Sequence, residues 1–196
     1  MTRFDLVEIF ASMQGEGRNT GRQCAFVRFA GCNFDCPWCD TAKEARFAAT
    51  AAEIVSELSQ YPVRSVVLTG GEPAAVEGAG ELAAALKSAG WWTAVETNGS
   101  IDAPWLRSID YVACSPKLEY PDRIAIEKAD EVRVVASSET AADFCREVEK
   151  RIEATDYYVS PCERGGEMDW ATAKSVLARL PRWSLSVQLH KILGFR

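Results

Sequence analysis

Two kinds of hydrophobic spacing alternate along the chain. Short runs of apolar and β-branched residues are typical of strands, and longer stretches with apolar residues three or four positions apart are typical of helices. The expected strands are Arg3–Phe10, Cys24–Ala30, Ser65–Thr69, Trp92–Glu96, Tyr111–Cys114, Glu131–Ala136, Asp156–Val159 and Ser184–Leu189. Because strands separated by helices favour βα units, we expect an α/β fold with a mainly parallel sheet.

Four helices are expected between these strands. The first begins at Thr50-Ala51-Ala52-Glu53, a capping box in which each polar side chain bonds the backbone N–H of the other. The apolar positions of the other three helices lie within Leu82–Ala89, Phe144–Ile152 and Trp170–Leu180. No linker, repeat or low-complexity stretch interrupts the pattern, so we expect one domain over residues 1–196.

Polar, motif-like segments come directly after five of the expected strands. They are Gln14–Gly17, Gly31-Cys32, Gly70–Pro73, Thr97–Gly99 and Ser115–Lys117. In parallel β/α folds the carboxyl ends of the strands form the active face. We therefore expect these segments to converge on one mouth.

Composition and charge exclude several classes of function. The chain has 196 residues, 47% of them hydrophobic, and a net charge of -6, which argues against a broad nucleic-acid surface. No apolar run approaches the roughly 20 residues that a membrane span needs. The N-terminal residues contain no apolar signal region, so we expect a cytoplasmic protein.

Three of the seven cysteines form a group. Cys32, Cys36 and Cys39 have the spacing C-x3-C-x2-C, which suits one soft metal centre. Three thiolates would bind three irons of a four-iron cluster and leave the fourth iron open for chemistry. The alternatives are a structural zinc ion, with Cys114, Cys162 or His190 as fourth ligand, and a fortuitous grouping.

The cysteine motif with Trp38 before its last cysteine, followed by Gly-Gly-Glu-Pro at Gly70–Pro73, resembles the radical S-adenosylmethionine (SAM) superfamily. Within it, the segments Gln14–Gly17 and Gln188–Lys191 resemble the 7-carboxy-7-deazaguanine synthases. The matching segments extend over nearly the whole chain. The resemblance implies an abridged, partial β/α barrel, and the chain is shorter than the about 250 residues of a full one.

The resemblance also implies roles for particular residues. Cys32, Cys36 and Cys39 would bind a [4Fe–4S] cluster, and Thr41 would bind Mg²⁺ through its hydroxyl. The residues implied to bind SAM are Trp38, Cys39, Asp40, Gly71, Ser115, Pro116, Lys117 and Pro161. Those implied to bind the substrate are Met13, Gln14, Gly15, Glu16, Arg28, Thr69, His190 and Arg196.

The implied reaction is a radical ring contraction. It would convert 6-carboxy-5,6,7,8-tetrahydropterin to 7-carboxy-7-deazaguanine with loss of ammonia, which supplies a precursor of queuosine and other 7-deazapurines. The implied partners are this small pterin, an electron donor such as flavodoxin or ferredoxin, and a second copy of the chain in a homodimer. Neither a nucleic acid nor a membrane is expected as a partner.

The residue pattern adds two expectations about orientation. Arg28 alternates with Val27 and Phe29, so it should point to the opposite face of its strand. Gln188 and His190 should share one face of the expected last strand. Taken without the resemblance, Ser115–Lys117 reads as an ordinary turn, Thr41 as the cap of a turn, and Arg28 as a solvated surface arginine.

Two other functions fit part of the pattern. A glycyl-radical-enzyme activase has the same cysteine spacing but would not need Gln14–Gly17 or Gln188–Lys191. A non-catalytic zinc module would need only the cysteines. One departure from the family lies in Ser160–Glu163, where only Pro161 matches well. Cys24, Cys114 and Cys145 have no assigned role and are expected to be buried thiols.

Overall fold

A curved nine-stranded sheet organises the computed structural model, which describes residues 2–195. The strands lie in the order β11-β8-β7-β6-β5-β4-β2-β1-β3, parallel from β11 to β2, with β1 antiparallel to both of its neighbours. Their bounds are β1 Arg3–Met13, β2 Gln23–Phe29, β3 Phe47–Thr50, β4 Ser65–Gly70, β5 Trp92–Thr97, β6 Tyr111–Cys114, β7 Lys128–Ala136, β8 Glu153–Pro161 and β11 Ser184–Leu185. The predicted α/β class and mainly parallel sheet are confirmed, and the architecture is a partial β/α barrel.

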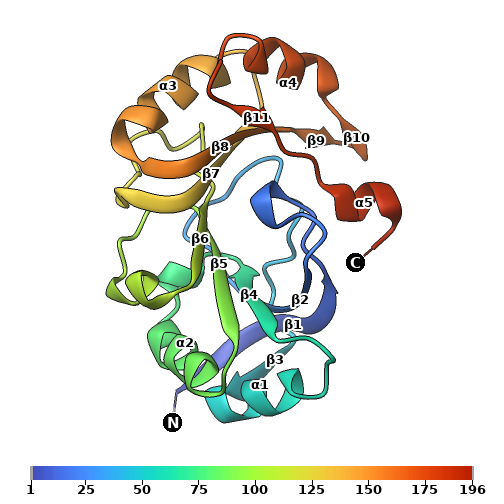
Figure 1. Cartoon of the computed structure of the whole chain (residues 1–196), viewed down its shortest axis with the longest axis vertical. Helices are drawn as coiled ribbons and strands as arrows, with labels where there is room; N and C mark the ends of the chain where they lie inside the picture. The colour runs from blue at the N-terminus through green and yellow to red at the C-terminus, as the bar shows by residue number, and fades with distance from the viewer. Residues whose placement is uncertain (1, 196) are drawn as a thin grey trace.

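Helices cover the outer face of this sheet, apart from the short one nearest the C-terminus, and the loop between β1 and β2 lies on the inner side (Figure 1). The α-helices are α1 Ala51–Leu58, α2 Ala79–Ser88, α3 Ala141–Arg151, α4 Trp170–Leu177 and α5 Leu189–Leu193. Short 3-10 helices are η1 Gly17–Asn19, η2 Pro73–Ala75 and η3 Pro104–Ser108, and a small separate hairpin pairs β9 Glu163–Arg164 with β10 Glu167–Met168. None of the helices within residues 2–195 is long and apolar enough to cross a membrane.

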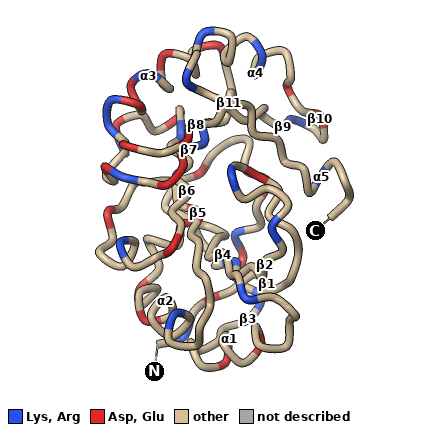
Figure 2. The backbone as a smooth tube through the Cα atoms, viewed as in Figure 1, with Lys and Arg blue, Asp and Glu red and all other residues tan. Residues whose placement is uncertain are grey.

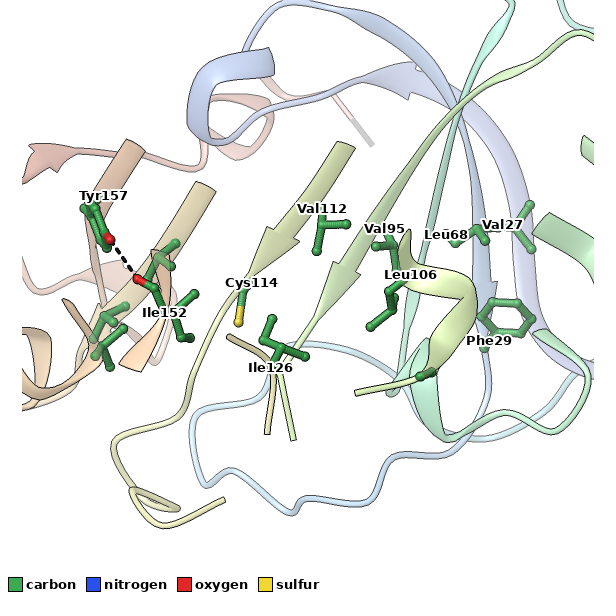
Figure 3. Packing of buried hydrophobic residues seen from close by; sticks show 14 of the residues in the cluster. Val27, Phe29, Leu68, Val95, Leu106, Val112, Cys114, Ile126, Ile152 and Tyr157 are labelled. Atoms are coloured by element: carbon green, nitrogen blue, oxygen red, sulfur yellow. Dashed lines mark hydrogen bonds between the residues drawn. The ribbon is translucent and has the colours of Figure 1, made fainter. Parts of the chain in front are cut away.

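The main core lies between the sheet and its outer helices. Alternate residues of neighbouring strands, among them Val27, Leu68, Val95 and Val112, point into this layer and are buried (Figure 3). At the far end of the layer, the hydroxyl of Tyr157 donates to the carbonyl of Ile152 over 2.7 Å. The period-two pattern of each strand therefore determines which residues face the helices and which face the interior of the barrel.

A second, smaller apolar cluster occupies one end of the interior. Its members are Phe10, Cys24, Phe26, Val67, Ala94, Tyr111 and Ala113. The rings of Phe10 and Phe26 stack with their centroids 5.1 Å apart. This cluster closes one end of the barrel, so the polar residues of the interior lie between it and the carboxyl ends of the parallel strands.

The predicted capping box is present at the start of α1. The backbone N–H of Glu53 donates to the Thr50 hydroxyl over 3.3 Å, and the Thr50 N–H donates to the Glu53 carboxylate over 2.7 Å. The other three predicted helices also form, although α4 ends at Leu177 and not at Leu180.

The expected strand Ser184–Leu189 is wrong in its second half. Only Ser184 and Leu185 pair with β8, and α5 begins at Leu189. The reason is that the backbone N–H of Leu189 donates to the carbonyl of Gly15 over 3.0 Å instead of to a neighbouring strand. Gln188 and His190 consequently do not share a strand face. The short strands β3, β9 and β10 were not predicted.

Candidate active site

Three free thiols lie on one loop beyond the carboxyl end of β2. We call residues 31–43 the cysteine loop. Cys32 and Cys39 are exposed and Cys36 is half-buried, and burial raises the pKa of the Cys36 thiol. The remaining cysteines, Cys24, Cys114, Cys145 and Cys162, are buried. Only the three predicted cluster ligands are therefore accessible to an inserted metal centre.

Aromatic contacts anchor the cysteine loop to the segment that follows β6. The ring of Phe34 stacks on Tyr120 with centroids 4.1 Å apart and planes within 8°. The indole N–H of Trp38 donates to Glu119 over 2.6 Å, and the Lys117 ammonium lies 5.3 Å from the same indole ring. These contacts orient the loop without using any of the three thiols.

A buried glutamate connects the turns after β4 and β5. Glu72, in the Gly-Gly-Glu-Pro motif, is 1% exposed and accepts from the Thr97 hydroxyl over 2.7 Å and from the Asn98 N–H over 2.6 Å. Burial raises its pKa even though these donors oppose the shift. Asn98 in turn donates to Asn33 of the cysteine loop over 2.9 Å. The motif thus determines the position of the cysteine loop relative to the sheet.

A cavity of about 200 Å³ opens beside the three cysteines. Most of the residues predicted to bind SAM border it, namely Trp38, Cys39, Asp40, Gly71, Ser115 and Lys117. A Cβ on Gly71 would lie 1.0 Å from the carbonyl oxygen of Gly31, so only glycine permits this close approach of two backbones. Pro116 and Pro161 are buried and line neither this cavity nor its larger neighbour, and their predicted role remains a prediction.

The donor set fits a [4Fe–4S] cluster with one open iron. Three accessible thiols on a short loop supply three ligands, and the adjoining cavity supplies space beside them. Among residues 2–195, no three Cys, His, Asp or Glu side chains are grouped closely enough to hold a single metal ion. A cluster requires no such grouping, because each thiolate binds a separate iron.

A larger cavity of about 480 Å³ adjoins the first. It is lined by the described residues predicted to bind substrate, which are Met13, Gln14, Gly15, Glu16, Arg28, Thr69 and His190. Glu16, Asp40, Thr41, Thr69, Glu96, Arg133 and Gln188 border both cavities. Arg196, the remaining predicted contact, lies outside the described residues.

Arg28 faces the larger cavity as its strand alternation predicts. Its neighbours Val27 and Phe29 are fully buried on the helix side of β2. The Nε atom of Arg28 donates to Glu8 on β1 over 2.8 Å. This ion pair fixes the guanidinium plane and directs the group toward the cavity.

Segments near the two ends of the chain meet at this cavity. The Gly17 N–H donates to the Ser186 hydroxyl over 2.9 Å, and the Gln188 amide donates to Glu16 over 2.7 Å. A Cβ on Gly15 would lie 2.0 Å from Nδ1 of His190. Burial lowers the pKa of His190, so its imidazole is neutral at pH 7.

Lys191 joins the carboxyl-terminal segment to the cysteine loop. Its ammonium donates to Asp40 over 2.5 Å and to Glu163 of β9. Burial disfavours the charged form of Asp40, but the hydrogen bond and the charge of Lys191, together with a hydrogen bond from Gln188, outweigh that effect and hold the Asp40 pKa below its usual value. The predicted SAM-side residue Asp40 is therefore part of an ion pair that closes one side of the larger cavity.

Sequence reasoning missed a group of buried charges in the interior. Arg133 is 4% exposed and forms ion pairs with Glu16, Glu96 and Glu131. The sequence does contain a signal for it, since Glu131 and Arg133 interrupt a run of valines within an expected strand. Charged residues at the alternate positions of a buried strand face an interior that must contain their partners.

Similarity to known proteins agrees with this geometry. The model of the Radical SAM superfamily matches residues 26–157, so the chain is a radical SAM enzyme. Over 97% of its length it is 40% identical to a 7-carboxy-7-deazaguanine synthase of Haemophilus influenzae, covering 93% of that protein. Over 98% it is 42% identical to the synthase of Neisseria meningitidis serogroup B, covering 94% of it. The chain therefore belongs to the 7-carboxy-7-deazaguanine synthase family.

A solved structure shares the fold. The crystal structure of QueE from Escherichia coli superposes with a TM-score of 0.76 at 23% sequence identity, over 96% of this chain and 95% of that one. The shared fold thus extends over nearly the whole of both chains. The resemblance stated from the sequence motifs is confirmed at the level of family and fold.

Proposed function

We propose that this chain contracts the ring of 6-carboxy-5,6,7,8-tetrahydropterin to give 7-carboxy-7-deazaguanine and ammonia. The observation that carries the proposal is the common wall of the two cavities. Thr41 and Thr69 border both the cavity beside the cysteines and the larger one. A substrate in the larger cavity would therefore lie next to SAM in the smaller one.

The cofactors follow from family membership and from the fit of the residues. Cys32, Cys36 and Cys39 would hold the [4Fe–4S] cluster. Residues predicted for SAM line the adjoining cavity, with Gly71 providing close backbone approach. When bound, the cluster and SAM supply the radical chemistry that the protein side chains cannot perform. Thr41, whose hydroxyl lies 3.3 Å from Asp40, would contribute an oxygen ligand to Mg²⁺.

The side chains of the larger cavity suit recognition of a pterin acid. The terminal nitrogens of Arg28 would bind the substrate carboxylate, because Nε is already committed to Glu8. Gln14 and Glu16 offer an amide and a carboxylate to the donors and acceptors on the pterin edge. The neutral imidazole of His190 has one nitrogen that can donate a hydrogen bond to the substrate and one that can accept a hydrogen bond from it.

Several partners remain part of the proposal. Reduction of the cluster requires an external donor, and a flavodoxin or ferredoxin is the expected class. We also expect a homodimer and a single domain. The product is a free base, which agrees with the acidic net charge of -6.

An anaerobic turnover assay tests the function. The reconstituted protein, with dithionite, SAM, Mg²⁺ and the pterin, should release 7-carboxy-7-deazaguanine, measured by chromatography and mass. Arg28→Met should abolish turnover of the pterin, because the carboxylate would lose its partner. Arg22→Met, on an exposed arginine of the preceding loop, is the matched control. Consumption of SAM with the pterin left intact would contradict the assignment.

A further inference from the structure

The Gln14–Gly17 loop reaches the cavity by an unexpected route. Because β1 is antiparallel to β2, its carboxyl end lies at the end of the barrel away from the cysteine loop. The loop must then turn back through the interior for Gln14 and Glu16 to face the cavity. Polar contacts inside the barrel must hold the loop in this position, because a loop of polar residues gains little free energy from apolar burial.

Arg133 is placed to do this. It extends inward from β7, while Val132 and Val134 on either side pack into the outer core. Its Nη1 atom pairs with Glu16 on the loop and its Nη2 atom with Glu96 on β5. One buried guanidinium thus connects the loop to two strands of the sheet.

Each of the two carboxylates is held at both oxygens. Glu16 accepts from Arg133 at Oε2 and from the Gln188 amide at Oε1, over 2.7 Å in the second case. Glu96 accepts from Arg133 at Oε2 and from the Gln14 amide at Oε1, over 2.9 Å. Rotation of either carboxylate would break two contacts, so both present a fixed orientation to the cavity.

Glu131 supports the same arrangement from the closed end of the barrel. It is 2% exposed and lies 2.9 Å from Nε of Arg133. It accepts from the Tyr111 hydroxyl over 2.7 Å and from the backbone N–H of Arg18 over 2.9 Å. A Cβ on Gly17 would lie 2.1 Å from a Glu131 oxygen, so the loop approaches this carboxylate as closely as a glycine permits.

The glutamates that pair with Arg133 come from different segments of the chain. Figure 2 shows acidic and basic residues interspersed along the whole fold. Arg133 nevertheless pairs with glutamates from the loop, from β5 and from its own strand. Such a buried, shared cation specifies geometry more than it adds stability.

We propose that Arg133 is a positioning residue, which seats the Gln14–Gly17 loop across the barrel and thereby orients Glu16 and Gln14 toward the substrate. The role in substrate recognition rests on the proposed function. The seating of the loop does not, because it follows from contacts within the chain.

Hydrogen–deuterium exchange tests the seating of the loop in the reconstituted, anaerobic enzyme. In Arg133→Lys, which keeps the charge but loses the planar fork, the amides of residues 14–18 should exchange about tenfold faster. The double variant Glu131→Gln/Arg133→Met removes one cation and one anion together, and residues 14–18 should exchange faster in it to a similar extent. Lys128→Met is the control, since Lys128 begins the same strand but its side chain is 78% exposed.

A pair of glycine variants tests the same contact without altering a charge. Gly17 and Gly21 both have positive φ, of 63° and 90°, so alanine strains the backbone at either position. Only at Gly17 would the new methyl collide with Glu131, whereas nothing lies within 4 Å at Gly21. Gly17→Ala should loosen the loop as the Arg133 variants do, and Gly21→Ala should not.

Steady-state kinetics then tests recognition. The Arg133 variants should raise KM for the pterin by roughly tenfold or more, and by more than they raise KM for SAM, with the iron content unchanged. Unchanged exchange in both folded Arg133 variants would overturn the proposal, and so would unfolding of both, which would make Arg133 merely structural. If the wild-type enzyme does not transform the pterin, the proposed function fails, while the exchange results still decide how the loop is held.

Discussion

The two cavities are held together by different kinds of contact. The cavity beside the cysteines is bordered by turns. Hydrogen bonds between uncharged groups, ring stacking and the buried Glu72 connect these turns to one another. The larger one is also bordered by Lys191, which pairs with Asp40 from a distant part of the sequence, whereas the Arg133–Glu16 pair borders both cavities. The second should therefore respond to salt more than the first does.

The most direct way to separate the two cavities is to remove a cluster ligand. Cys36→Ala should abolish turnover and lower the iron content, because only accessible thiols on the cysteine loop can hold the cluster. Binding of the pterin, measured by calorimetry, should persist, since no cysteine lines the larger cavity.

Cys145→Ala is the control for this substitution. Cys145 is fully buried in the outer core, so its loss should reduce stability slightly and leave the iron content unchanged. Loss of iron in both variants, or in neither, would refute the assignment of the ligands.

Substitution of Glu72 should give the next largest effect. In Glu72→Ala, the Thr97 hydroxyl and the Asn98 N–H lose their buried acceptor, and the free energy of unfolding should fall by about 3 kcal/mol. Urea titration measures this change. Glu77→Ala, an exposed glutamate shortly after the same motif, should change it by less than about 0.5 kcal/mol. Equal effects of the two substitutions would show that Glu72 does not connect the turns.

The Lys191 ion pairs should contribute a smaller and salt-dependent amount. Lys191→Met should lower the unfolding free energy by roughly 1 kcal/mol at low salt, because its partners are partly exposed. It should also raise KM for the pterin more than KM for SAM. Lys150→Met removes a more exposed pair with Glu147 and serves as the control. A loss that does not shrink at high salt would contradict the electrostatic origin.

The smallest effect concerns His190 and pH. Burial lowers its folded-state pKa below the unfolded value of about 6.5, so the unfolded chain takes up the proton first as pH falls. The stability contributed by the neutral imidazole should then be lost as pH drops below about 6.5. Because this is the only histidine, His190→Gln should flatten the stability profile between about pH 5 and 7. Identical pH profiles of stability for the wild type and His190→Gln would show that the pKa of His190 is not lowered by folding.

The smaller cavity could be predicted from the sequence where it is lined by local motifs, but not where Glu96 and Arg133 line it. These motifs lie at strand ends, such as Gly70–Pro73 and Ser115–Lys117, and parallel strands bring such ends together. Pro116 and Pro161 were the exceptions, because both are buried and line neither cavity. Sequence spacing identifies the residues that share a turn, but it does not show which of them are buried and so cannot contact a ligand.

The larger cavity was predicted only in part. The sequence identified Gln14, Glu16 and Arg28, but not Arg133, because an ion pair between distant segments leaves no periodic pattern in either of them. The expected final strand failed for the same reason. Its apolar alternation was real, but a carbonyl of Gly15 took the N–H of Leu189 and began a helix there.

The meeting of Gly15 and Leu189 sets an order of events during synthesis on the ribosome. Gly17 and Glu16 are made well before the residues that complete their surroundings, because Ser186 follows Gly17 by 169 residues and Gln188 follows Glu16 by 172 residues. The cysteine loop and its anchors are made long before that point. The surroundings of Gly15 and Glu16 can therefore be completed only after the whole sheet up to β11 has been made.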